Sequence, residues 1–416
     1  MNSFEKLSDE IVLHIFENID WKHNVQLRGT CRRFRRLSDD PILWNKHYSR
    51  TAQLIMTPRS SHSDYHKLYR ISRNWSTGRA TSSSINTNSD KILTQLHENY
   101  VFSTLRNSGT LFVHSFSPVD AEQDLSDKSI LAEFKLKPIA DISIDSNLSY
   151  HSDGVIRLES HLYQKKPRVD AGFEKVLYTS LNSPYYITCT DRFRLTIYHV
   201  AIQPTFIQSY TSSIAYHPAS IHIDQDSWNV VVAYITPSFP SLYSVAVQTF
   251  PLRSGDCLYT NANKDIKSAR RTSRILDISI SRNSRWIALA REDNVVEVFE
   301  LTECLKEHSK LPTTPKYLSL RLHMTLNGHN CAASSVAIAN DRCVTGDVRG
   351  DIKIWNLKPN TNVEDISKPF DLAESRGITL REHPPMPSMG VKQIAFDNTS
   401  VLSVTRDFMR VYKFDV

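Results

Sequence analysis

Arginine recurs at one position ahead of aromatic residues that belong to short apolar strands. The arginines that stand six residues before such an aromatic are Arg192, Arg349 and Arg406, and Arg291 lies near the corresponding position of its own segment. A guanidinium group binds a phosphate or a carboxylate through two parallel hydrogen bonds, so a row of arginines would hold an acidic or phosphorylated segment. Alternatively, each arginine is a solvated turn residue or pairs with an adjacent carboxylate such as Asp191 or Asp407.

Catalytic signatures are missing from the sequence. It contains no P-loop, no G-x-G-x-x-G, no G-x-S-x-G and no H-E-x-x-H motif. The sixteen histidines are scattered, and we interpret the pair His62 and His66 as solvated loop residues rather than metal ligands. The six cysteines form no C-x-x-C pair, which indicates free thiols in a reducing compartment. We therefore expect no enzyme activity, no cofactor and no metal.

Composition and charge argue against a nucleic-acid-binding protein and a membrane protein. A net charge of +6 over 416 residues is too small for a dedicated nucleic-acid binder. The longest apolar run, around residues 230–235, is far shorter than the roughly 18 residues that cross a bilayer, and the N-terminus lacks the apolar core of a secretory signal. We expect a soluble protein of the cytoplasm, the nucleus or both, without a nucleic-acid or membrane partner.

The first fifty residues have helical periodicity. Ile11, Ile15 and Ile19 recur at every fourth position and would form one apolar stripe. Ser8 is a suitable N-cap for this helix, and Asp40 followed by proline predicts the start of a later one. Residues 51–79 are expected to be a partly helical linker.

From residue 80 to the end, short alternating strands replace the helical pattern. They fall into seven groups about 45 residues apart, which is typical of four-stranded blades repeated around an axis. The groups are 92–116 with a further strand near 130–136, 141–158, 185–200, 213–252, 275–301, 331–357 and 391–416. The last group is one strand short, and residues 80–87 could complete it and close the ring. A pair of packed sheets is the alternative, and it fits the regular spacing less well.

The helical segment resembles an F-box. The matching positions run from Leu7-Ser8-Asp9-Glu10-Ile11 through Cys31-Arg32-Arg33-Phe34 to Leu43-Trp44, with Ser8 where proline is usual and Phe34 where tryptophan is usual. The resemblance implies a small all-α module over residues 1–50 that binds the Skp-type adaptor of a Skp–cullin–F-box ligase. The residues expected in its core or at the adaptor surface are Leu7, Ile11, Ile15, Phe16, Leu27, Cys31 and Trp44.

Two alternatives apply to this module. It could be an ordinary helical cap packed against the strands that follow. Its arginine cluster, residues 32–36, could be a nucleic-acid or nuclear-localisation patch, although we favour a solvated helix face. A module of about forty residues buries little apolar surface by itself, so an apolar stripe left over after internal packing favours a partner protein.

The strand region resembles WD repeats. The best repeat starts at Gly328-His329 and ends at Trp355-Asn356. In that family a histidine, a strand Ser or Thr, a turn Asp and a strand Trp form one hydrogen-bonded set, which His329, Thr345 and Trp355 match. The Asp position, six residues before the tryptophan, is Arg349, so the resemblance predicts an incomplete network. Residues 80–416 are therefore expected to form an all-β, WD-repeat-like propeller with seven blades.

Together the two resemblances imply the substrate receptor of a ubiquitin ligase. The F-box would bind the adaptor and, through it, the cullin and RING subunits, while the propeller would bind a protein substrate. Related receptors grip acidic or phosphorylated degrons with arginines in such turns, which would give Arg192, Arg291, Arg349 and Arg406 a role. The step Asn74-Trp75 to Gly78 is similar to the junction in the dactylin-like group. The alternatives are a scaffold that binds the adaptor without directing degradation, and a propeller enzyme or RNA-binding propeller whose helical start matches by coincidence.

Overall fold

The computed structural model divides the chain into two compact units. One unit comprises residues 1–81 together with 413–416, and the other comprises residues 82–412. The structure describes residues 7–51, 64–86, 92–97, 100–105, 110–115, 130–135, 141–144, 148–152, 155–158, 176–182, 184–200, 204–211, 218–224, 227–238, 242–252, 257–261, 273–305, 316–339, 342–357, 378–380 and 390–415. His62 lies outside these residues.

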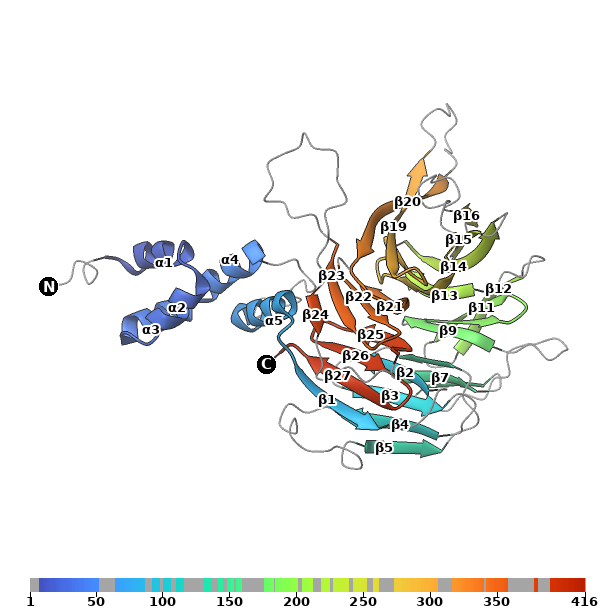
Figure 1. Ribbon diagram of the computed structural model, residues 1–416, viewed down its shortest axis with the longest axis horizontal. Helices are drawn as coiled ribbons and strands as arrows, with labels where there is room; N and C mark the ends of the chain where they lie inside the picture. Colours follow the sequence, from blue (N-terminus) through green and yellow to red (C-terminus); the bar gives the residue numbers. More distant parts are fainter. Residues whose placement is uncertain are drawn as a thin grey trace. The chain divides into compact units, whose positions relative to one another are not determined.

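The first unit is helical (Figure 1). Its helices are α1 (Asp9–Glu17), α2 (Trp21–Leu27), α3 (Arg32–Ser38), α4 (Pro41–Thr51) and α5 (Tyr65–Thr77). The expected start of α4 is confirmed, because Asp40 Oδ1 accepts a hydrogen bond from the backbone N–H of Ile42 at 2.8 Å. Ser8 occupies the N-cap position of α1 but makes no side-chain cap bond. None of the helices in the described ranges is both long and apolar enough to cross a bilayer.

Helix α5 packs on the last residues of the chain within the first unit. The ring of Trp75 stacks on that of Phe414 with centroids 3.9 Å apart. Asn74 Nδ2 donates to the carbonyl of Phe414 at 2.9 Å, and an Arg70 nitrogen donates to the carbonyl of Asp415 at 3.0 Å. Gly78 ends the helix in a left-handed conformation with φ 70°, which glycine adopts without a steric penalty. Of the expected linker, residues 64–79 thus contain helix α5, which contacts Phe414 and Asp415, and residues 52–63 lie outside the described residues.

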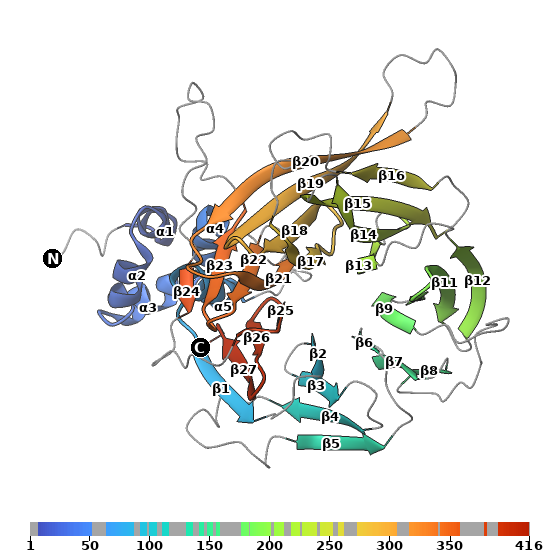
Figure 2. The same ribbon diagram turned by 45° about the vertical axis from the view of Figure 1, so that its right-hand side comes forward.

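The second unit is built from antiparallel sheets that follow one another around a centre (Figure 2). The first three sheets in chain order contain β2 (Ile92–His97), β3 (Tyr100–Leu105), β4 (Thr110–Ser115) and β5 (Ile130–Lys135); β6 (Asp141–Ile144), β7 (Leu148–Ser152) and β8 (Val155–Leu158); and β9 (Val176–Asn182), β10 (Tyr185–Thr190), β11 (Arg194–Val200) and β12 (Pro204–Thr211). In these three sheets the strands nearest to the centre are β2, β6 and β9 (Figure 2).

Four further sheets continue the same pattern. Their strands are β13 (Pro218–Asp224), β14 (Asn229–Ser238), β15 (Leu242–Pro251) and β16 (Leu258–Asn261); β17 (Ile275–Ile280), β18 (Trp286–Arg291), β19 (Val295–Leu305) and β20 (Lys316–Asn327); β21 (Ala333–Ala339), β22 (Arg342–Asp347), β23 (Ile352–Asn356) and β24 (Ile378–Leu380); and β25 (Gln393–Phe396), β26 (Ser400–Val404) and β27 (Phe408–Lys413) with β1 (Thr81–Asn86). This arrangement is a β-propeller.

The ring closes as the sequence predicted. Strand β1, at the start of the strand region, adds to the outer side of β27 at its end, in the sheet order β1-β27-β26-β25. The larger apolar clusters of the propeller then lie between consecutive sheets rather than within one. Phe193 and Leu195 of one sheet, for example, share a cluster with Val230, Val232 and Phe250 of the next. Because side chains alternate across a strand, each sheet supplies both of its faces to such cores.

Candidate functional site

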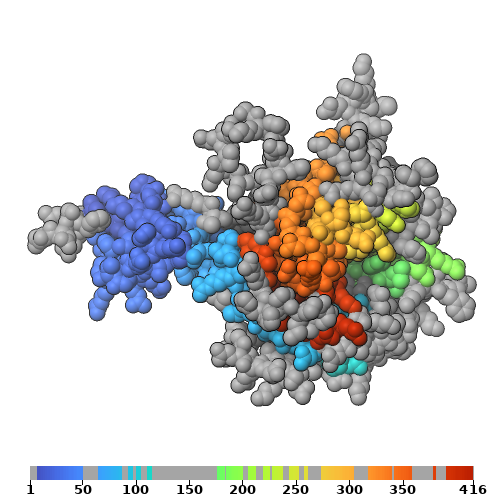
Figure 3. All heavy atoms as spheres, in the orientation of Figure 1, coloured from blue at the N-terminus to red at the C-terminus, as the bar shows by residue number. Residues whose placement is uncertain are grey.

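The helices α1 to α4 have a small apolar core. Its fully buried members are Val12, Phe16, Leu37 and Leu43, and Phe16 meets Phe34 edge to face with centroids 5.3 Å apart. Leu7, Ile15 and Leu27 pack against this core and are partly buried. Trp44 is also buried, and its indole N–H donates to the carbonyl of Ser38 at 2.7 Å. In the space-filling view, the atoms of α1 to α4, in dark blue, form one compact group (Figure 3).

Two arginines of the α3 cluster pair with a carboxylate of the same module. Arg33 Nε donates to Asp9 Oδ1 at 2.8 Å, and Arg36 also pairs with Asp9. The hydrogen bond from Arg33 holds the pKa of Asp9 below its ordinary value despite the opposing effect of burial. Arg28 pairs with Asp39 across 3.1 Å. These contacts favour the interpretation as a solvated helix face over a nucleic-acid patch.

Among the residues described for this module, three large apolar side chains remain on its surface. Ile11 is 50% exposed, Val25 43% and Ile42 63%. Of the residues predicted for the core or the adaptor surface, Phe16 and Trp44 are core, Leu7, Ile15 and Leu27 are intermediate, and Ile11 and Cys31 are exposed. The sequence analysis missed Val25 and Ile42. A signal was present for Ile42, because it directly follows a proline at the first helical position, where an apolar side chain has little reason to be buried.

An aromatic cluster joins α5 to the other helices of its unit. Trp44 lies against His66 and Tyr69, with ring centroids 4.3 and 5.5 Å away. The guanidinium of Arg73 sits 3.6 Å from the ring centroid of Trp21. Burial lowers the pKa of His66, which therefore contributes a neutral ring. His66 is thus part of a packed cluster and not the solvated loop residue that we expected.

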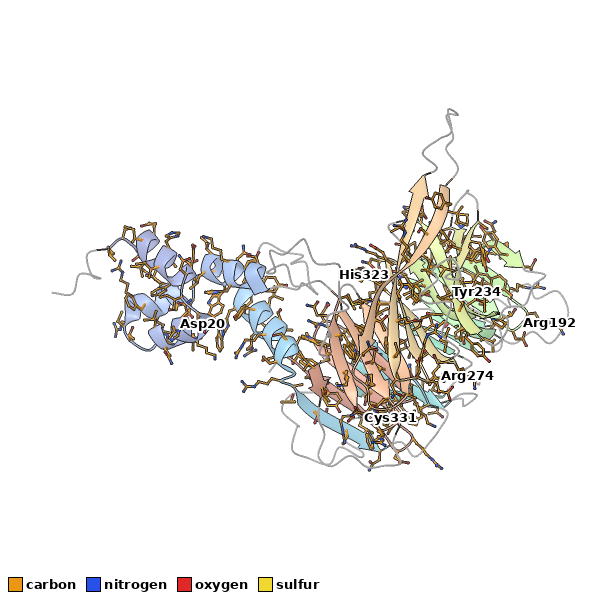
Figure 4. All side chains as sticks on the ribbon, turned by 45° about the horizontal axis from the view of Figure 1, so that its top comes forward. Asp20, Arg192, Tyr234, Arg274, His323 and Cys331 are labelled. Carbon is orange, nitrogen blue, oxygen red and sulfur yellow. The ribbon has the colours of Figure 1, made fainter. Side chains whose placement is uncertain are left out.

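The predicted propeller arginines separate into two classes. Arg192, Arg349 and Arg406 are exposed, each in the turn that joins the second and third strands of its sheet; Figure 4 labels Arg192. Arg291 differs from the expectation, because its side chain is fully buried. Its Nε donates to Glu297 at 2.6 Å, and its two terminal nitrogens donate to the carbonyls of Ser273 and Tyr243.

The buried position of Arg291 has a clear physical cause. It is the last residue of β18, and its side chain points into the interior, where Glu297 of β19 supplies the opposite charge. An ion is stable in such surroundings only when it is paired and its donors are satisfied. The carbonyl of Tyr243 belongs to the neighbouring sheet, so Arg291 also ties two sheets together. We correct the prediction accordingly: Arg291 supports the fold and is not exposed for a substrate.

The hydrogen-bonded network in the sheet β21–β24 is complete, contrary to the sequence prediction. Thr345 Oγ1 lies 2.6 Å from His329 Nε2 and accepts from the indole N–H of Trp355 at 2.7 Å. His329 Nδ1 lies 3.2 Å from Asp347 Oδ2. The carboxylate thus comes from Asp347, two residues before the expected position held by Arg349. Because an ionised carboxylate only accepts hydrogen bonds, Nδ1 of His329 donates to Asp347.

Asp347 also holds the turn that carries Arg349. Its Oδ1 accepts the backbone N–H groups of Arg349 and Asp351, both at 2.9 Å. Burial by itself would raise the pKa of Asp347, but the hydrogen bonds from His329 and from these two N–H groups lower it overall. The carboxylate is therefore ionised at neutral pH and keeps the turn, with its exposed arginine, in one conformation.

A second carboxylate, Asp277, ties neighbouring sheets near the centre. Its Oδ2 accepts from the hydroxyl of Ser335 at 3.0 Å and from the backbone N–H of Val336 at 2.9 Å. Burial raises the pKa of Asp277 to about 6. Among the residues that the structure describes, no group of three or more His, Cys, Asp or Glu side chains is placed to hold a metal ion.

The comparisons with known proteins agree with both parts of this architecture. Residues 5–50 match the F-box-like family model. The chain is similar in fold to the crystal structure of the Cps50 (Swd1) β-propeller domain from Myceliophteria thermophila, with a TM-score of 0.51 and 11% identity over 80% of this chain and 99% of that one. No curated protein matches the chain. The chain thus carries an F-box-like domain at residues 5–50, followed in sequence by a β-propeller.

Proposed function

We propose that this protein is a substrate receptor of a Skp–cullin–F-box ubiquitin ligase. The F-box-like domain binds the Skp-type adaptor, which brings the cullin and RING subunits, and the propeller binds the protein that is to be modified. The chain itself contributes no chemical step. It acts by holding a substrate lysine near a charged conjugating enzyme, which raises the effective concentration of the two reactants.

The observation that carries the proposal is the set of exposed apolar side chains on the F-box-like domain. Among the described residues, Ile11, Val25 and Ile42 belong to the most exposed large apolar side chains, and they lie on a module whose core is small. Apolar surface on helices is stabilised when a partner groove covers it. The match of residues 5–50 to the F-box-like family supports a Skp-type adaptor as that partner.

Adaptor binding is tested with the pair Ile11→Asp and Ile42→Asp in the full-length chain. Because both side chains are at least half exposed, the variant keeps its fold while two carboxylates enter the adaptor surface. We expect co-precipitation of the Skp-type adaptor to fall at least about tenfold, as for loss of an interface hot spot. Val348→Asp, at an apolar position of the propeller that is 45% exposed, is the control and should bind normally. Unchanged binding by the double variant would remove the adaptor assignment.

The finer part of the proposal concerns the substrate surface and the blade number. We infer that Arg192, Arg349 and Arg406 contact an acidic or phosphorylated segment of the substrate, and that the three-stranded sheet β6–β8 makes the seventh blade. The triple substitution of these arginines by glutamine should leave adaptor binding intact and abolish substrate capture in cells with the proteasome blocked.

Deletion of residues 1–50 distinguishes a receptor from a scaffold. A captured substrate should persist longer in cells that carry only the truncated chain, because the propeller then holds it without the ligase. A substrate whose lifetime is the same with both chains would favour the scaffold alternative.

A further inference from the structure

Strand β12 forms an outer edge of the propeller that no other described strand covers. It stands last in the sheet order β12-β11-β10-β9, pairs with β11 alone and lies on the outside of the ring (Figure 2). Among residues 205–211, every side chain is exposed except that of Tyr210, which is half-buried. An edge strand has one row of backbone N–H and C=O groups without a partner strand, and such a row can bind a further strand.

Two large apolar side chains are neighbours in this strand. Phe206 is 54% exposed, which is the highest value for a large apolar side chain in the described part of the propeller, and Ile207 is 37% exposed. Ile207 is also the extra residue of a bulge, because the register with β11 passes from Gln208 to Phe206 without a partner for it. The extra residue of a bulge is left unpaired within its own sheet. This edge therefore offers apolar surface together with backbone hydrogen-bonding groups.

The other outer strands differ from β12 in length, charge or apolar surface. Strands β8, β16 and β24 have at most four residues. The sequences of β5 and β20 contain charged residues, such as the exposed Arg321 of β20, and charge at an edge discourages pairing with another strand. Strand β1 consists mainly of serines and threonine, and its one large apolar side chain, Ile85, is buried. By contrast, β12 has eight residues, none of them charged.

The composition of β12 favours a second copy of the same strand as its partner. In an antiparallel pair of identical strands, a two-fold axis places residues near the middle against their own copies. Like charges opposite each other are destabilising, and an uncharged strand avoids them. An axis near Ile207 brings the two Ile207 side chains together and each Phe206 close to the other. Cross-strand contacts between such apolar side chains stabilise a sheet.

We propose that two copies of this chain associate through antiparallel pairing of β12 with β12, so that the two β9–β12 sheets continue into one. The contact uses the same edge on both copies, and the assembly therefore ends at the dimer. Two propellers held together raise the effective concentration of a second contact with a shared partner. The pairing involves no residue of the F-box-like domain and none of the exposed turn arginines, so it does not depend on ligase function.

The first test is analytical ultracentrifugation of the full-length chain over a range of concentrations. We expect a reversible dimer with twice the chain mass of 47.7 kDa. A single-chain mass at all concentrations up to about 100 µM would overturn the proposal. A mass that keeps increasing beyond two copies would overturn it as well, because pairing of one edge with itself closes at two.

A charge exchange at Ile207 then locates the contact. Ile207→Lys places two ammonium groups across the axis and should raise the dissociation constant of the dimer at least about tenfold, and Ile207→Glu should do the same with two carboxylates. Mixing the two variants should restore a dimer, because each lysine then meets a glutamate. An Ile207→Lys chain that dimerises as well as the unsubstituted chain, or a mixture that stays monomeric, would contradict pairing through β12.

Two control variants examine the other exposed apolar surfaces. Tyr317→Lys changes a 43% exposed side chain on another outer strand, β20, and should dimerise normally. The double variant Ile11→Asp with Ile42→Asp should also remain a dimer, because these residues belong to the F-box-like domain. Loss of the dimer in either control would assign the contact to a different surface and overturn the proposal.

Discussion

Two neighbouring sheets of the propeller stabilise the same region in different ways. In the sheet β21–β24, His329, Thr345, Asp347 and Trp355 form a buried hydrogen-bonded network within one sheet. In the sheet β17–β20, the aligned position of Asp347 is Arg291, which pairs with Glu297 and donates to the carbonyl of Tyr243 in the preceding sheet, β13–β16.

This difference shows that the fold fixes where a buried charged side chain stands in the sheet, but not whether its charge is positive or negative. Both Asp347 and Arg291 stand eight residues before a strand aromatic, Trp355 in one sheet and Phe299 in the other. Each is the last residue of the second strand, and each has its charge satisfied by several partners. A buried ion needs such partners whichever sign it carries. The two sets of contacts differ in extent. The hydrogen-bonded network stays within its sheet, whereas the contacts of Arg291 also link two sheets.

The largest effect is expected from breaking the ion pair. Glu297→Gln leaves the charge of Arg291 buried without its counter-ion, and we expect the free energy of unfolding to fall by roughly 3–5 kcal/mol. The double variant Arg291→Met with Glu297→Leu removes both charges and should lose much less. Urea unfolding of the full-length chain, followed by circular dichroism, measures both. A single variant that is as stable as the double one would show that the pair is not the main stabilising contact.

A smaller effect is expected from the network. Thr345→Val keeps the volume but removes the hydroxyl that contacts both His329 and Trp355, so two buried polar groups lose a partner. We expect a loss of about 2 kcal/mol in the same unfolding experiment. Thr196→Val, at a site where the hydroxyl has only a 3.4 Å contact with Ser209, is the control. Equal losses at both positions would mean that the network adds nothing beyond packing.

The smallest effect concerns the pH dependence of stability, which should have opposite signs for two carboxylates. The pKa of Asp277 is raised from 3.8 to about 6, so between pH 4 and 6 the folded chain holds a proton that the unfolded chain has released. Its contribution to stability therefore increases as the pH falls through that range. The pKa of Asp347 is lowered, so its contribution is present at neutral pH and is lost on acidification below 3.8.

The variants Asp277→Asn and Asp347→Asn separate these contributions. In the unsubstituted chain, Asp277 adds stability as the pH falls from 6 to 4, and Asp347 loses its contribution at lower pH. Asp277→Asn should abolish the first effect and Asp347→Asn the second. The midpoint of urea unfolding across pH 3 to 7 reports both slopes. Parallel curves for all three chains would show that neither carboxylate is perturbed.

The sequence alone was sufficient for the succession of elements. The helical character of the first fifty residues and the switch to alternating strands near residue 80 both correspond to the structure. The predicted stripe does not, because α1 ends at Glu17, before Ile19, and buries Val12 and Phe16, whereas Ile11 is 50% exposed. The sequence predicted that residues 80–87 would complete the last sheet, and β1 at Thr81–Asn86 does so. These features depend on local periodicity and on the number of strands, and both can be derived from the linear sequence.

Only the tertiary structure decided which side chain performs which role. Asp347 replaces the expected carboxylate because the direction of its side chain at the end of β22 brings it to His329. Arg291 is buried because β19 places Glu297 opposite it, and Tyr185 meets Trp228 only because two sheets pack together. Such contacts depend on register between strands and on packing between sheets, and residues that are far apart in sequence carry no local sign of either.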